Sequence, residues 1–159
     1  MQAVQMRVVI IGCGDPLHGD EAIAWEAARE LCSLWAITSV LVRFCDKITS
    51  ELAQAVSKAD LVIFIGTDPK ELPGRISSEH VGMMKAPGLN TPLEPAGLLG
   101  YVHDRFGTSP EAWRFTVGAD RFGLGTGISD PVRSAMPGLL GQVSDLVSKR
   151  VADHAAATV

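Results

Sequence analysis

The chain has 159 residues, of which 47% are hydrophobic and 20% are charged, with a formal net charge of −4. This length allows one domain with a full hydrophobic core, and the composition is typical of a folded globular protein. The acidic balance and the lack of a basic run with interleaved aromatic residues argue against nucleic acid or an anionic membrane surface as partners. We therefore expect residues 1–159 to form a single domain.

The first residues and the cysteines bear on the compartment. The segment "RVVIIG" (7–12) has the length of a buried strand and lacks the layout of a signal peptide. No apolar stretch approaches the roughly 18 residues that a membrane span needs. Cys13, Cys32 and Cys45 are scattered and odd in number, so neither a disulfide framework nor a CxxC zinc site is expected. Together these properties predict a cytoplasmic protein.

Short apolar runs alternate with helix-length segments along the chain. In chain order the sequence predicts a strand at 7–11, a helix at 20–35, a strand at 40–44, a helix at 49–59, a strand at 61–65, a helix at 95–106, a strand at 114–118 and a helix from 130 to about 152. Pro137 and Gly138 are expected to bend or interrupt the last helix early. The segment 68–95 is rich in Gly and Pro and is expected to form a long excursion with one extra strand.

The first and third predicted strands are apolar throughout, as in central parallel strands that are covered on both faces. Strand–helix alternation of this kind favours a parallel sheet. The predicted fold class is therefore α/β, with a mostly parallel central sheet and helices on both faces.

The first strand runs into a glycine-rich turn, "GCGDPLHGDE" (12–21), which opens the first helix. In an open parallel sheet, ligands bind at the carboxyl ends of the strands, where the winding direction reverses. A dinucleotide site is one interpretation, because the turn begins with G-x-G and Asp46 follows the second strand as a ribose-binding acid would. However, Leu17 stands where the dinucleotide fingerprint has its third glycine, and the acids of the turn would repel a pyrophosphate.

The acidic residues of this turn have a structural interpretation and a functional one. Asp20 is expected to cap the first helix. Glu21 is joined by His18 and by Asp68, which follows the third strand, and adjacent parallel strands bring such ends near one another. Carboxylate and imidazole ligands that converge on one sheet edge can hold a divalent transition metal. We therefore predict a metal site formed by His18, Glu21 and Asp68.

The same turn also carries a family resemblance. The segment "GCGDPLHGDEAIAWEAAREL" (12–31) resembles the opening motif of the [NiFe]-hydrogenase maturation endopeptidases, roughly G-x-G-N-x-L-x-x-D-[DE]-x-x-G. Supporting matches follow in the right order, namely "KADLVIFIG", "PGRI", "FTVGAD" and "GTGISDPVRSAMPGLLGQV". The resemblance covers nearly the whole chain and implies an α/β fold with a twisted central sheet flanked by helices, of the phosphorylase/hydrolase-like type.

Members of that family clip a C-terminal extension from the hydrogenase large subunit once nickel has been inserted. The resemblance implies a protease that recognises the nickel in its substrate through a Glu, an Asp and a His. Glu21 matches the family's glutamate. The position of the aspartate is Gly66, and Asp68 lies two residues further on. Pro92 or Leu93 occupies the position of the histidine.

His18 on the first turn could restore an imidazole to the site, with His80 and His103 as weaker substitutes. The implied activity is nickel-dependent endopeptidase cleavage, with Glu21 and Asp68 as catalytic residues and nickel, supplied by the substrate, polarising the scissile carbonyl or activating a water. The implied partner is the precursor of a [NiFe]-hydrogenase large subunit. Two other hypotheses stay open: a non-catalytic relative that binds the immature large subunit as an assembly factor, and a nucleotide-binding protein.

Overall fold

The computed structural model describes residues 5–36, 38–85 and 93–157. Within these ranges, one sheet is formed by β1 (Arg7–Cys13), β2 (Ser39–Cys45), β3 (Leu61–Asp68), β4 (Ile76–His80) and β5 (Glu111–Gly118). The strand order is β2-β1-β3-β5-β4. Neighbouring strands are parallel except for β4, which runs antiparallel to β5. The predicted α/β fold with a mostly parallel sheet is therefore confirmed.

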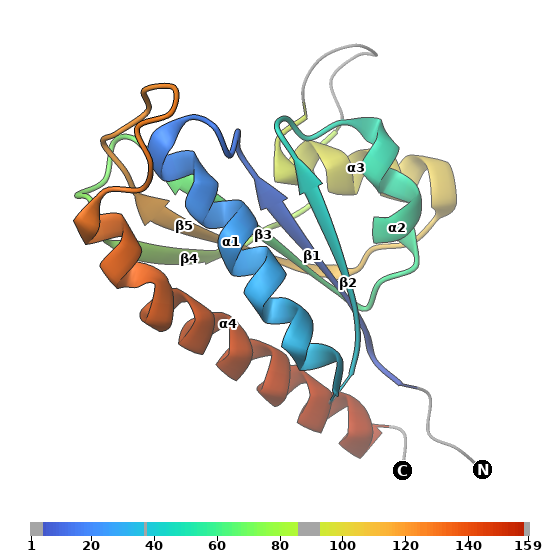
Figure 1. Ribbon diagram of the computed structural model, residues 1–159. Coiled ribbons are helices and arrows are strands. Elements are labelled where there is room, and N and C mark those ends of the chain that lie inside the picture. The colour runs from blue at the N-terminus through green and yellow to red at the C-terminus, as the bar shows by residue number, and fades with distance from the viewer. Residues whose placement is uncertain (1–4, 37, 86–92, 158–159) are drawn as a thin grey trace.

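Helices cover both faces of this sheet (Figure 1). On one face lie α1 (Ala22–Glu30) and α4 (Asp130–Ala157), and on the other lie α2 (Ala53–Ser57) and α3 (Pro95–Phe106). Three short 3-10 helices, η1 (Gly19–Glu21), η2 (Leu31–Ala36) and η3 (Ser50–Leu52), adjoin α1 and α2. No helix in the described part of the chain is long and apolar enough to cross a membrane.

The core consists of two clusters that follow the alternation of side chains along the inner strands. Ile10 and Ile63 point toward α1 and α4, whereas Ile11 and Phe64 point toward α2 and α3, and all four are essentially fully buried. Because successive strand residues face opposite sides, a strand covered on both faces must be apolar throughout. This explains the continuous apolar runs of β1 and β3.

Four of the five strands lie where the sequence predicts them, and β4 is the extra strand expected in the segment 68–95. The predicted helix at 20–35 is shorter, because regular α-helix ends at Glu30 and continues as η2. The expected interruption at Pro137 is wrong, since Pro137 lies inside a continuous α4. A proline removes one backbone hydrogen bond, and the fully buried Leu139 and Val143 beyond it hold α4 against the sheet.

The strand order predicts a ligand position at the carboxyl ends of β1 and β3. The chain passes from β1 to β2 on one side and then returns to β3 on the other, so the winding direction reverses there. The last register pair of these two strands is Gly12 with Ile65. The loop after β1 and the end of β3 therefore lie at the same edge of the sheet.

Gly12 permits close packing of β1 on α1. A Cβ added at Gly12 would lie 2.7 Å from the carbonyl oxygen of Ala24. Since that atom belongs to helix backbone, Gly12→Ala is expected to lower the free energy of unfolding by about 1–3 kcal/mol. The matched control is Gly141→Ala on the exposed side of α4, where nothing lies within 4 Å of an added Cβ. This control is expected to raise the free energy by about 0.5–1 kcal/mol. Urea denaturation measures both, and an unchanged midpoint for Gly12→Ala would contradict the packing argument.

Candidate functional site

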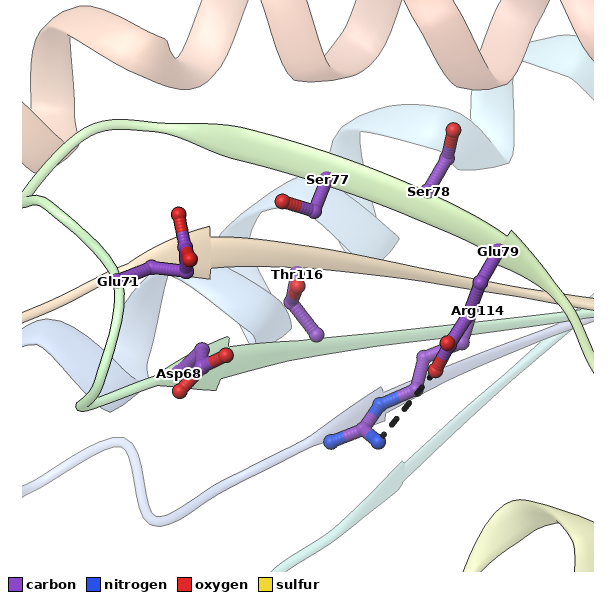
Figure 2. A pocket seen from close by; sticks show the side chains of 7 residues that line it. All are labelled: Asp68, Glu71, Ser77, Ser78, Glu79, Arg114 and Thr116. Atoms are coloured by element: carbon purple, nitrogen blue, oxygen red, sulfur yellow. Dashed lines mark ion pairs between the residues drawn. The ribbon is translucent and has the colours of Figure 1, made fainter.

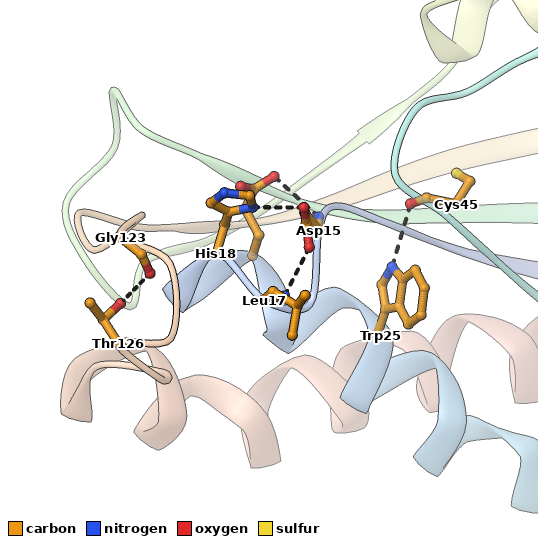
Figure 3. A network of polar contacts seen from close by, with 8 residues as sticks. Asp15, Leu17, His18, Trp25, Cys45, Gly123 and Thr126 are labelled. Carbon is orange, nitrogen blue, oxygen red and sulfur yellow. Dashed lines mark hydrogen bonds and ion pairs between the residues drawn. The ribbon is translucent and has the colours of Figure 1, made fainter.

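Asp15 lies at the centre of the turn that follows β1 (Figure 3). Its Oδ2 is 2.7 Å from His18 Nδ1, and its Oδ1 accepts a hydrogen bond from the N–H of Leu17 at 2.9 Å. The Leu17 N–H lowers the pKa of Asp15, and His18 lowers it further. Asp15 is thus held as a carboxylate that orients the half-exposed His18 ring.

Glu21 reaches the same turn from the start of α1. The backbone N–H of Asp15 donates a hydrogen bond to Glu21 Oε1 at 3.4 Å. Gly14 makes this approach possible, because its φ is 148° and an added Cβ would lie 3.2 Å from Glu21 Cβ. The structure therefore brings two of the three predicted site residues, His18 and Glu21, together around Asp15.

Asp20, which precedes Glu21, is fully buried and has a role that the sequence does not reveal. The capping prediction is wrong, since no side chain caps η1 or α1. Instead its carboxylate accepts hydrogen bonds from the N–H groups of Asp120, Arg121 and Ser129 at 3.1, 3.0 and 2.6 Å, and from Ser129 Oγ at 3.1 Å. Burial raises the pKa of Asp20, but these bonds outweigh burial and the net pKa is lowered. Asp20 thus ties the loop between β5 and α4 to the start of α1.

Further contacts hold that loop against the turn. The N–H of Gly125 donates to the carbonyl of Leu17 at 2.8 Å, and His18 forms an isolated antiparallel bridge with Leu124. Leu17 and Leu124 are 64% and 71% exposed. Two apolar side chains therefore face solvent next to His18.

Asp68, the third predicted site residue, ends β3 and lies in a neighbouring pocket (Figure 2). Its Oδ1 accepts a hydrogen bond from the N–H of Lys70 at 2.8 Å. The pocket has a volume of about 190 Å³ and is lined by Asp68, Glu71, Ser77, Ser78, Glu79, Arg114 and Thr116. Arg114 forms an ion pair with Glu79 at 3.8 Å. Asp68 thus belongs to a polar hollow between β3, β5 and β4.

Among the described residues, no three His, Cys, Asp or Glu side chains gather closely enough to hold a metal ion. At the position expected to carry an aspartate, Gly66 leaves space: a Cβ there would meet only the carbonyl oxygen of Cys13, at 3.8 Å. At the position expected to carry a histidine, Leu93 is 8% exposed and belongs to the core beneath α2 and α3. Pro92 lies outside the described residues.

The two weaker histidine candidates lie on other elements. His80 ends β4 and packs edge-on against Trp113, with ring centroids 5.5 Å apart. His103 on α3 is within hydrogen-bond distance of Ser109 Oγ, at 3.2 Å. Both side chains already have contacts outside the turn that holds His18 and Glu21.

A pair of cysteines that are scattered in sequence meets at the same sheet edge. Cys13 and Cys45 end β1 and β2 as register partners, and their Sγ atoms are 3.7 Å apart. The hydrogen bond between them lowers the pKa of Cys45 and, together with burial, raises that of Cys13. The sequence carries a signal for this pair: Cys13 follows the predicted strand 7–11 by one glycine, Cys45 directly follows the predicted strand 40–44, and these two strands are parallel neighbours.

Comparisons with known proteins show the fold of the chain. No protein-family model matches it, and no curated protein is significantly similar in sequence. A [NiFe] hydrogenase maturation protease, HycI from Thermococcus kodakarensis KOD1, superposes with a TM-score of 0.68 at 20% identity, covering 91% of this chain and 94% of that one. The hydrogenase maturating endopeptidase HybD from E. coli gives 0.68 at 18% identity with the same coverage. A hydrogenase 2 maturation peptidase from Thaumarchaeota archaeon SCGC_AB-539-E09 gives 0.64 at 20% identity, covering 89% and 97%.

Proposed function

We propose that this chain is a hydrogenase maturation endopeptidase, which removes the C-terminal extension from the large-subunit precursor of a [NiFe] hydrogenase. One observation carries the proposal. Glu21, the residue that matches the family's glutamate, lies at the carboxyl edge of the sheet, and the N–H of Asp15 binds its carboxylate there. The chain also has the fold of known maturation proteases over 91% of its length.

The chemistry of the donor set supports a nickel ion that arrives with the substrate. Glu21 and Asp68 offer carboxylates and His18 offers an imidazole, ligand types that suit divalent transition metals. In the proposed roles Glu21 would contact the nickel, and Asp68 and His18, which do not both gather with Glu21 in the protein alone, would complete the site when the precursor binds. Asp15 positions the His18 ring through its contact with Nδ1 at 2.7 Å. Nickel bound there with the precursor would supply Lewis-acid chemistry, polarising the scissile carbonyl or a water.

The surroundings of the site suit a protein substrate. The exposed Leu17 and Leu124 flank His18 and offer an apolar contact for the precursor. The proposed compartment is the cytoplasm, since three scattered cysteines do not make the disulfide framework that is typical of secreted domains.

The test is incubation of the purified chain with the large-subunit precursor in nickel-loaded and nickel-free forms, followed by intact-mass measurement. The expected result is loss of the C-terminal extension from the nickel-loaded form alone. Binding of the precursor without shortening would instead identify an assembly factor. Absence of both binding and cleavage would overturn the proposal.

Gly66→Asp is expected to strengthen the site, because it restores a carboxylate where the resemblance expects one and the backbone leaves room for it. Without precursor, the Ni²⁺ affinity of the variant measured by calorimetry should exceed that of the wild type by about tenfold, or 1.4 kcal/mol. The matched control is Gly82→Asp, which adds the same charge at an exposed position after β4. An equal gain for both variants would indicate non-specific attraction rather than a ligand at position 66.

A further inference from the structure

Cys13 and Cys45 form a thiol pair that the proposed protease chemistry does not use. They are directly opposite one another on parallel strands, at the last pair of the β1–β2 register. Adjacent strands lie about 4.8 Å apart, which is inside the range of roughly 4.4–6.8 Å between Cα atoms that a disulfide spans. Their Sγ atoms, now 3.7 Å apart, must approach to about 2.05 Å for a bond to form.

We infer that Cys13 and Cys45 are a reversible dithiol–disulfide site that reacts with low-molecular-weight disulfides such as glutathione disulfide. A metal site is the other chemistry open to two thiols, but the described residues bring no third His, Cys, Asp or Glu side chain to them. Both cysteines are partly exposed at the carboxyl ends of β1 and β2, and Cys45 lies on the edge strand, where a small disulfide can approach it. The geometry therefore favours thiol exchange over metal binding.

The two sulfurs have different roles in this exchange. Cys45 is the attacking group, because it lies on the edge strand β2 and because its contact with Cys13 lowers its pKa and so favours its thiolate. Its Sγ bonds to one sulfur of glutathione disulfide, the sulfur–sulfur bond of the oxidant breaks, and one glutathione thiolate leaves. Cys13 then gives its proton to water and attacks Cys45 Sγ, which releases the second glutathione. Both cysteines are oxidised, and one glutathione disulfide is reduced to two glutathione molecules.

The bond would form next to the turn that holds Glu21. The N–H of Gly14, directly after Cys13, donates to the carbonyl of Cys45 at 2.9 Å, and the next residue, Asp15, donates its N–H to Glu21. Any shift of the strand ends on oxidation therefore reaches the contact of Glu21. This consequence, unlike the disulfide itself, rests on the proposed function.

The test is alkylation of the whole chain after equilibration in glutathione buffers, with the modified residues located by mass spectrometry. Reduced protein should be alkylated at all three cysteines, and oxidised protein at Cys32 alone, with reversal by dithiothreitol. In Cys13→Ser a mixed disulfide with glutathione should persist on Cys45. In Cys45→Ser the reaction at Cys13 should be at least about tenfold slower than the wild-type reaction, since the more easily ionised thiol is missing.

The matched control is Cys32→Ser, because Cys32 is exposed on η2, away from the pair. It should oxidise like the wild type. Three alkylated cysteines in the oxidised wild type, or a stable glutathione adduct in place of the internal bond, would overturn the inference.

Cleavage of the nickel-loaded precursor should fall at least about tenfold on oxidation, which is 1.4 kcal/mol. If the reduced protein does not cleave at all, the proposed function fails while the alkylation pattern still decides the disulfide.

Discussion

Replacing Glu21 by glutamine is expected to slow cleavage of the nickel-loaded precursor at least about 100-fold, since the loss of groups that merely support a metal ligand already costs 10–100-fold. Glutamine has nearly the same size and keeps an oxygen that can accept the hydrogen bond from the N–H of Asp15. The variant therefore removes the negative charge and leaves the local packing in place. A loss of this size would reflect the missing charge at the metal contact rather than misfolding.

Single-turnover cleavage followed by intact mass measures this effect. The matched control is Glu30→Gln, which makes the same change at an exposed position at the end of α1. Its rate should stay within about twofold of the wild type, because surface changes away from the site have small effects. Precursor binding should persist in both variants, since the apolar contacts of Leu17 and Leu124 are unchanged. Undiminished cleavage by Glu21→Gln would show that Glu21 is not the metal contact.

Asp20→Ala is expected to lower the free energy of unfolding by about 3–5 kcal/mol, because it leaves several buried donors without a partner at once. The carboxylate that it removes accepts bonds from three backbone N–H groups and the Ser129 hydroxyl. For a chain of this size the loss corresponds to a fall in Tm of roughly 10 °C. Asp104→Ala, at an exposed position on α3, is the matched control and should change stability by less than about 0.5 kcal/mol. A loss for Asp20→Ala no larger than that of the control would show that the hydrogen bonds of Asp20 contribute little to stability.

The same carboxylate predicts a pH dependence of stability. Its pKa is lower in the folded state than the ordinary value of 3.8, so the unfolded chain takes up a proton more readily. The stabilisation is therefore complete above about pH 4 and is lost as the pH falls through the lowered pKa. In Asp20→Asn this part of the acid dependence should vanish, which thermal melts between about pH 3 and 7 can measure. An unchanged acid slope in the variant would assign the dependence to other carboxylates.

The α/β class and most of the elements could be predicted from the sequence, because they depend on local patterns of residues. The continuous apolar runs of β1 and β3 require cover on both faces, and the fully buried Ile10 and Ile63 meet that requirement. The position of Glu21 after a glycine-rich turn likewise followed from the order of residues along one strand and one helix. For β4 the sequence predicted only that the segment 68–95 contains an extra strand. The bounds of β4 depend on its pairing with β5.

Which distant residues meet depends on how the strands and helices are arranged in space. Asp20 accepts hydrogen bonds from residues about 100 positions away, and no local pattern specifies such a partner, so helix capping was the natural expectation. Pro137 remains inside α4 because burial beyond it outweighs one lost hydrogen bond. Asp68 lies in a pocket whose other walls come from β4 and β5, and the pairing of Cys13 with Cys45 depends on the register of β1 and β2. Strand register and the crossings between strands bring these groups together. Both are set by the burial of whole faces of the sheet, so they cannot be predicted from residues that are neighbours in the sequence.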